Sequence, residues 1–105
     1  MQRRVYRTSV RPEFRQQYVD AHKEFPGELL RRYRKAGMHS CAVYLLDCEL
    51  VMVIESENPE RLAKELGNDA IDRAWQNYVG PMKADGDWQL MEEIFHTDAI
   101  PSSTN

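Results

Sequence analysis

Residues 38–56, MHSCAVYLLDCELVMVIES, decide the fold. The runs 38–46 and 49–56 are dominated by apolar, aromatic and β-branched side chains, which is the composition of β-strands. Only Asp47 and Cys48 separate them, the length of a tight hairpin loop. We therefore predict two neighbouring antiparallel strands in the middle of the chain.

The sequence before this hairpin predicts a strand and then an interrupted helix. Residues 3–10, RRVYRTSV, alternate between two faces and are expected to form the first strand. From Pro12 onward, apolar and aromatic residues recur at helical spacing. A Pro-Gly pair interrupts this stripe, so we expect a break around residues 23–27 and a second helical stretch to Lys35, closed by Gly37.

The sequence after the hairpin predicts two short helices and a final strand. The Asn-Pro-Glu triplet at residues 58–60 is a helix start, and Gly67 is expected to end that helix. The Asn-Asp pair at residues 68–69 caps another helix. Residues 88–96, WQLMEEIFH, are expected to form the last strand, and residues 98–105 a loose tail.

The predicted order of elements, β-α-β-β-α-β, is typical of the ferredoxin-like α+β fold, with a four-stranded antiparallel sheet covered by helices on one face. The second helix is split in two. The chain has 105 residues, 42% of them apolar and 30% charged, and no linker or repeat. We therefore expect one globular domain that spans residues 1–105.

Composition excludes several classes of partner and site. The net charge of −3 provides no basic field for nucleic acid. No run of about 18 apolar residues is present, and no signal-peptide pattern follows Met1, so we expect a cytoplasmic protein that does not contact a membrane. Cys41 and Cys48 are interpreted as small buried thiols. No CxxC or HExxH spacing predicts a metal, and no GxSxG, GxGxxG or Walker motif predicts serine hydrolase or nucleotide chemistry.

Tyr18 and His22 are the first candidates for chemistry. They are four residues apart, so on a helix they lie on one face, together with Phe14 and Phe25, and point toward the sheet. Histidine suits acid/base catalysis near neutral pH, and a neighbouring tyrosine hydroxyl can orient a substrate. Spacing alone favours the plainer interpretation that both are hydrogen-bonded core residues.

Trp75 is the third candidate. On the helix after residues 68–69 it could fold over the same face of the sheet, where a tryptophan and a tyrosine together make the flat apolar wall on which sugars commonly lie. Core packing is the alternative interpretation of a tryptophan at this spacing. Trp88 is no better supported as a site residue than Trp75. The pair Glu92-Glu93 is a poor candidate for paired catalytic carboxylates, because adjacent strand residues face opposite ways.

A further set of residues recurs along the chain in a familiar order. Its members are Tyr18-x-x-x-His22, Glu28-Leu29, Gly37-x-His39, Tyr44-Leu45, Arg73-x-Trp75, Met82 and Leu90-x-Glu92-x-x-Phe95-His96. Together they resemble the L-rhamnose mutarotase family over about residues 3–97. The order and the spacing of these short motifs, more than any one of them, carry the resemblance.

The resemblance implies a small cofactor-free isomerase that interconverts the α and β anomers of a free aldose. It also implies a dimeric α+β barrel, a homodimer in which the sheet faces of two subunits pack together. By the same resemblance His22 is the proton donor, Tyr18 holds the sugar and Trp75 provides a stacking surface.

Two positions depart from the family pattern. Cys41 stands where the family commonly has a sugar-contacting tyrosine, and Ala74 stands where it has the first tryptophan of a pair. Both are expected in the substrate site, as smaller residues that widen it and change which hydroxyls it can bind. The expected substrate is therefore L-rhamnose or a related aldose such as L-fucose.

Two other interpretations remain open at the level of sequence. Cofactor-independent monooxygenases share this fold and also place His, Tyr and Trp near a cavity, so the fold does not choose between the two reactions. A non-catalytic sugar-binding relative is the other alternative, because two family aromatics are missing.

Overall fold

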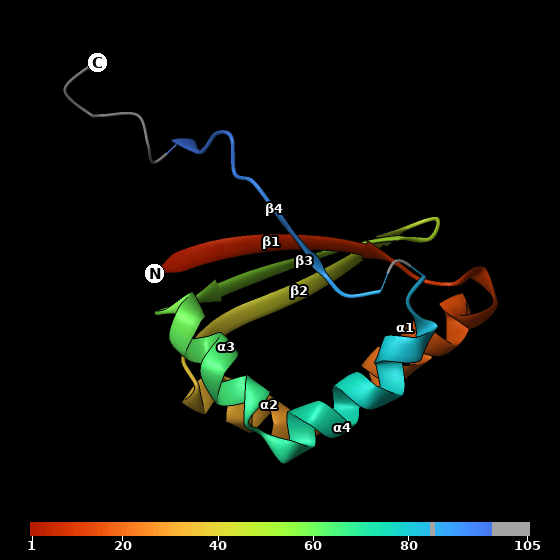
Figure 1. The fold of residues 1–105 in the computed structure, drawn as a ribbon, viewed down its shortest axis with the longest axis horizontal. Helices are drawn as coiled ribbons and strands as arrows, with labels where there is room; N and C mark the ends of the chain where they lie inside the picture. The colour runs from red at the N-terminus through yellow and green to blue at the C-terminus, as the bar shows by residue number, and fades with distance from the viewer. Residues whose placement is uncertain (85, 98–105) are drawn as a thin grey trace.

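The computed structural model describes residues 1–84 and 86–97 (Figure 1). The elements are β1 (Gln2–Ser9), η1 (Pro12–Phe14), α1 (Arg15–Lys23), α2 (Gly27–Lys35), β2 (Met38–Leu46), β3 (Glu49–Ser56), α3 (Pro59–Gly67), α4 (Ala70–Val79), η2 (Gly80–Met82) and β4 (Gln89–Met91), where η marks a 3₁₀ helix. The predicted ferredoxin-like α+β order is confirmed. The tail predicted at residues 98–105 lies outside the described residues.

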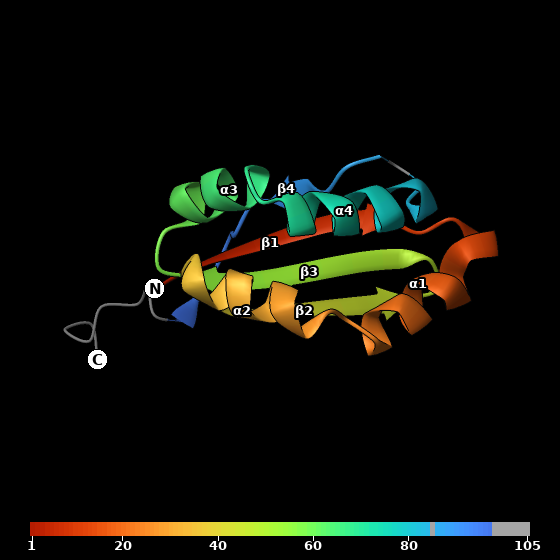
Figure 2. The ribbon, with the colours of Figure 1, turned by 90° about the horizontal axis from the view of Figure 1, so that it is seen from below.

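The four strands form one antiparallel sheet in the order β2-β3-β1-β4. All four α-helices lie on the same side of this sheet, with α1 and α2 over β2 and β3 and with α3 and α4 over β1 and β4 (Figures 1 and 2). The described part of the chain leaves the other face of the sheet uncovered (Figure 1).

Local sequence signals explain most element boundaries. The Asn58 side chain accepts a hydrogen bond from the Arg61 amide and so caps α3, and Asp69 caps α4 in the same way through the amides of Ile71 and Asp72. Gly37 follows α2 with a φ of 97°, a left-handed conformation that favours glycine. The predicted break in the first helix is confirmed at residues 24–26.

The last strand is shorter than predicted, and the prediction for residues 88–96 was wrong in extent. Only Gln89–Met91 pair with β1. Beyond them, Ile94 is 90% exposed and Phe95 is 69% exposed. Because the described residues bury little of these side chains, little burial offsets the conformational entropy lost by extending the segment along β1.

The hydrophobic core is divided between the two ends of the helix-sheet interface. One cluster contains Val10, Tyr18, Leu50, Val79 and Met82. The other contains Ala36, Met38 and Leu62. The space between the clusters is a cavity, although the interiors of small domains are ordinarily close-packed.

The uncovered face of the sheet has an apolar row at its centre, with the ion pairs Arg3–Glu93 and Arg7–Glu49 on either side of it. Strand register places Ala42, Val53, Val5 and Met91 in one row across all four strands. Tyr44 lies in the next row and is 62% exposed. No helix among the described residues is long and apolar enough to cross a membrane.

Candidate active site

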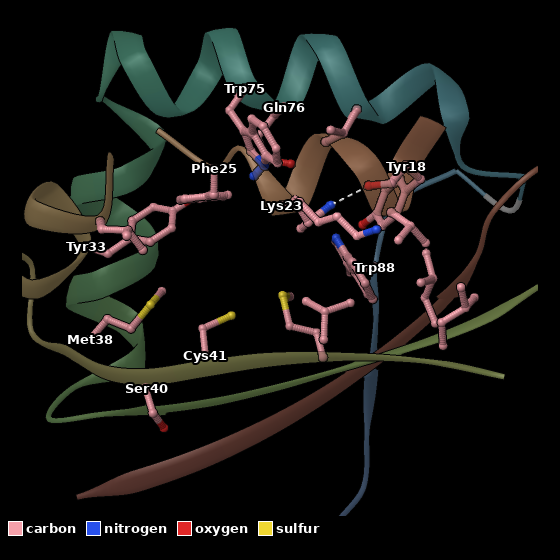
Figure 3. Close-up of a pocket in the computed structure, with 18 of the residues that line it drawn as sticks. Tyr18, Lys23, Phe25, Tyr33, Met38, Ser40, Cys41, Trp75, Gln76 and Trp88 are labelled. Atoms are coloured by element: carbon pink, nitrogen blue, oxygen red, sulfur yellow. Dashed lines mark hydrogen bonds between the residues drawn. The ribbon is translucent and has the colours of Figure 1, made fainter. Parts of the chain in front are cut away.

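A cavity of about 920 Å³ opens between the helices and the sheet (Figure 3). This volume lies at the upper end of the range of about 300–1,000 Å³ that is typical of small-molecule sites. In Figure 3, Trp75 and Phe25 form the roof, Cys41 rises from the sheet below, Tyr33 and Met38 lie at one end, and Tyr18 and Trp88 lie at the other.

The structure brings Tyr18, His22 and Trp75 together in the wall of this cavity. The ring centroids of Tyr18 and His22 are 4.5 Å apart, and those of His22 and Trp75 are 5.1 Å apart in an edge-to-face arrangement. Phe25 extends the cluster, because its ring centroid is 4.6 Å from that of Trp75. Three candidates from two distant segments of sequence therefore form one site.

A main-chain hydrogen bond fixes the state of the His22 ring. Nδ1 lies 2.8 Å from the carbonyl oxygen of Tyr18, one helical turn earlier, and the bond is drawn as a dashed line in Figure 3. A carbonyl oxygen can only accept, so Nδ1 carries the proton. Nε2 is thus the nitrogen left to exchange a proton with a ligand.

The Tyr18 side chain is buried, but its hydroxyl is open to the cavity. The residue is only 4% exposed, and burial is the main cause that raises the pKa of its phenol to about 12, with the Cys41 thiol contributing a smaller increase. No described residue hydrogen-bonds the hydroxyl, and its oxygen is not among the enclosed polar atoms. At neutral pH Tyr18 therefore offers a protonated hydroxyl that can donate to a ligand or accept from it.

Cys41 lies on the sheet side of the cavity. Its accessible surface is that of an exposed residue, since the cavity is open, yet the surrounding protein desolvates the thiol enough to raise its pKa. Solvent inside the cavity stabilises a thiolate less than bulk water does, so the thiol stays protonated. Cys41 is therefore a small neutral side chain, and Cys48 is also a free thiol.

Ala74 occupies a different place from the other candidates. It is exposed on α4 and is not among the residues that line the cavity. A small residue at position 74 therefore cannot widen the cavity of the single chain. Cys41, in contrast, does line this cavity.

Three large aromatic residues of the cavity wall, Phe25, Tyr33 and Trp88, were not predicted as part of the site. Phe25 and Tyr33 belonged to the apolar helical stripe, where spacing could not distinguish core from cavity, and Trp88 precedes the last strand. For Phe25 and Tyr33, the signal that could have found them is the run of aromatics on both sides of the helix break, and no local signal marks Trp88.

The charged groups that line the cavity are all basic. They are Arg15, Lys23 and Arg34, with the histidines His22 and His39. Paired-carboxylate chemistry of the glycosidase type therefore has no residues here. Within residues 1–84 and 86–97 no group of three or more His, Cys, Asp or Glu side chains could hold a metal ion.

Comparison with known proteins places the chain in a family. A family model described as L-rhamnose mutarotase matches residues 3–97. The chain belongs to the L-rhamnose mutarotase family. Members of this family are carbohydrate isomerases, and the resemblance inferred from the sequence motifs is confirmed.

Individual relatives agree with this assignment. An L-rhamnose mutarotase of Oceanobacillus iheyensis is 27% identical over 105 aligned positions, which cover 93% of this chain and all of that protein. The crystal structure of an L-rhamnose mutarotase from Formosa agariphila superposes with a TM-score of 0.78 at 14% identity, covering 92% of this chain and 99% of the other.

The fold is also shared outside the mutarotase family. A candidate antibiotic biosynthesis monooxygenase from Bordetella bronchiseptica has a TM-score of 0.69 at 15% identity, covering 89% of this chain and 96% of the other. Likeness at this level of identity shows the fold alone. The family match over residues 3–97, and not the topology, distinguishes the mutarotase.

Proposed function

We propose that this mutarotase interconverts the α and β anomers of L-rhamnose or a related aldose, with His22 as the group that transfers the proton. The observation that carries the proposal is the His22 ring, whose Nδ1–H is held by the Tyr18 carbonyl and whose Nε2 is left for the ligand. Trp75 and Tyr18 flank this ring with an apolar platform and a free hydroxyl.

Anomerisation needs a proton removed from the anomeric hydroxyl and a proton added to the ring oxygen. Both oxygens are bonded to C1, so a single imidazole nitrogen can serve both. Nε2 of neutral His22 accepts the hydroxyl proton and returns it to the ring oxygen as the C1–O bond of the ring breaks and the aldehyde forms. Rotation about the C1–C2 bond and the reverse steps close the other anomer. Such general acid/base help is worth roughly 10²- to 10⁴-fold.

Tyr18 and Trp75 are assigned binding roles. The pKa of about 12 keeps the Tyr18 phenol protonated, so it holds a sugar oxygen by a hydrogen bond and does not compete with His22 for the transferred proton. The indole of Trp75 offers its face to the apolar side of the sugar. Cys41 leaves space at the sheet side and offers weaker hydrogen bonding than a tyrosine there would.

Anomer exchange tests this proposal directly. Saturation transfer between the α and β anomeric protons is measured by NMR for L-rhamnose, L-fucose and their stereoisomers, with the wild type and with His22→Ala. The expected result is exchange above the buffer rate for at least one of these sugars, reduced by roughly 10²-fold or more in the variant. Exchange that never exceeds the buffer rate, or that is unchanged by His22→Ala, would show that the proposal is wrong.

The functional unit in this proposal is a homodimer formed through the uncovered face of the sheet. The row Ala42, Val53, Val5 and Met91 gives this face an apolar centre. Met91 is 45% exposed in the single chain. An antiparallel sheet can leave one face to solvent when that face is polar, but apolar side chains across all four strands favour a second apolar layer.

A further inference from the structure

Tyr33 lines the cavity and forms a polar pair with Asp72 behind it, which is not a lining residue, and the mechanism above uses neither. The Tyr33 hydroxyl, on α2, donates a 2.7 Å hydrogen bond to Oδ1 of Asp72, on α4. Asp72 is 7% exposed, and within residues 1–84 and 86–97 the one other side chain that donates to it is the amide of Gln76, at 3.5 Å. No lysine or arginine among the described residues forms an ion pair with this buried carboxylate.

This pairing determines what Tyr33 can offer a ligand. A phenol has one proton, and here Asp72 accepts it. Burial, and then the hydrogen bond to Asp72, raise the pKa of Tyr33, so the hydroxyl stays protonated. Toward the cavity the Tyr33 oxygen therefore presents lone pairs only, which makes it an acceptor with a fixed direction. A sugar hydroxyl is the donor that matches it.

Tyr33 stands at the opposite end of the cavity from the proton-transfer group. Figure 3 shows Tyr33 at one end and Tyr18 at the other, with Phe25 and Trp75 along the roof between them. The ring centroid of Phe25 lies 6.3 Å from that of His22 and 5.9 Å from that of Tyr33. Cys41, on β2, lies between these two ends on the sheet side of the cavity (Figure 3).

We propose that Tyr33, held by Asp72, is a specificity-determining residue that accepts a hydrogen bond from a hydroxyl on the part of the sugar remote from C1. Asp72 is a positioning residue that acts through Tyr33. This inference rests on the proposed function and deepens it. The site then recognises the sugar at two ends, with C1 at His22 and a hydroxyl-bearing carbon at Tyr33.

The competing explanation is that the pair merely ties α2 to α4. The chain offers a matched control for that role, because Arg32 on α2 donates a 2.9 Å ion-paired hydrogen bond to Asp69 at the start of α4. This second tie joins the same two helices, and neither of its residues lines the cavity. If helix anchoring were the whole role of Tyr33, Arg32→Gln and Tyr33→Phe would change activity alike.

The experiment compares three variants on a sugar panel. Anomer exchange is measured by saturation-transfer NMR and sugar affinity by calorimetry, for the wild type, Tyr33→Phe, Asp72→Asn and Arg32→Gln. The panel contains the preferred aldose and its deoxy analogues, each lacking one hydroxyl. Thermal unfolding of each variant is followed by circular dichroism. Asp72→Asn keeps an oxygen that can accept the Tyr33 proton, so it serves as the conservative variant.

The expected result has three parts. Tyr33→Phe raises KM and Kd for the full sugar by roughly 5- to 100-fold, the consequence of an unpaired buried hydroxyl, with a smaller change in kcat. For the wild type, the affinity for one deoxy analogue is lower than that for the full sugar by a similar factor. For Tyr33→Phe, the affinities for that analogue and for the full sugar are equal. Arg32→Gln behaves as the wild type toward every sugar, and Asp72→Asn stays within about threefold of it because the hydrogen bond persists.

Other outcomes overturn the inference. It is wrong if Tyr33→Phe keeps the wild-type preference for every hydroxyl, or if its effects equal those of Arg32→Gln. If Tyr33→Phe does not fold, Asp72→Ala replaces it, since that variant leaves the Tyr33 hydroxyl in place but unheld, and unchanged selectivity there overturns the inference. If the wild type exchanges no sugar, the proposed function fails separately, and calorimetry alone decides: loss of affinity in Tyr33→Phe supports the inference, and unchanged or absent sugar binding overturns it.

Discussion

The Nδ1–H of His22 donates a 2.8 Å hydrogen bond to the main-chain carbonyl of Tyr18, and the rings of the same two residues lie 4.5 Å apart. The helix backbone thus sets both the tautomer and the tilt of the imidazole. The same turn also places the Tyr18 hydroxyl in the cavity. Metal-bound and catalytic histidines are commonly oriented by a carboxylate or carbonyl partner on the other ring nitrogen, and α1 supplies that partner from its own main chain.

Replacing His22 by asparagine separates the two roles of the ring. The Asn side chain can place an N–H near the position of Nδ1 and keep the bond to the Tyr18 carbonyl, but it cannot exchange a proton near neutral pH. We expect His22→Asn to lose roughly 10²- to 10⁴-fold in anomer exchange while its thermal midpoint and sugar affinity stay near those of the wild type. His22→Ala is the control without the carbonyl bond. Exchange retained in His22→Asn would mean that another group transfers the proton.

The buried phenol of Tyr18 makes stability depend on alkaline pH. Its pKa is raised to about 12 in the folded chain, against about 10 in an unfolded one. The protonated form is thus favoured by folding, so this contribution to stability is fully present below about pH 10 and is lost as the pH rises toward 12. Urea unfolding at pH 8.5 and 11 should show the wild type losing about 1.4 kcal/mol more than Tyr18→Phe. Equal losses in the two proteins would contradict this.

Local sequence signals were sufficient for most of the fold. A two-residue loop between two apolar runs, a proline after an N-cap residue and a Pro-Gly pair inside a helical stripe each restrict the backbone by short-range sterics. The elements at 38–46, 49–56 and 59–67 therefore have the predicted bounds. The final strand has no such signal. Its length depends on how far it pairs with β1, and the sequence of residues 88–96 does not reveal that extent.

The candidate site was predictable where two residues share one helical turn, and less so across elements. Tyr18 and His22 follow from i, i+4 spacing, whereas their contact with Trp75 required the resemblance to a family. The bond between Tyr33 and Asp72 joins residues 39 positions apart, so no local pattern indicates it. Ala74 was expected in the site from the family pattern, yet it does not line the cavity of the single chain. A position in a family pattern does not tell which way a side chain faces on its helix.

Restoring a tyrosine at the position of Cys41 tests the origin of sugar selectivity. Cys41→Tyr places a ring and a hydroxyl on the sheet side of the cavity, below Trp75 and Phe25, and reduces the free volume there. We expect exchange of L-rhamnose to increase relative to exchange of the other aldoses, by a factor of roughly 10 or more, because the site gains a polar partner for a sugar hydroxyl. Cys41→Ser is the control that adds polarity without volume. A ratio of rates that does not change would place selectivity elsewhere.

The uncovered sheet face gives a prediction for assembly. Val53 lies on β3 within the apolar row shared with Ala42 and Val5, on the face turned away from the cavity. If this face is the dimer interface, Val53→Arg buries an unpaired guanidinium, which costs several kcal/mol and exceeds what one interface residue contributes favourably. Light scattering after size exclusion should then show a dimer for the wild type and a monomer for Val53→Arg. Asn77→Arg adds the same charge on the exposed side of α4 and should remain dimeric. A dimeric Val53→Arg protein would place the interface on another surface, because a sheet packed on a sheet at about 10 Å has no room for a solvated arginine at its centre.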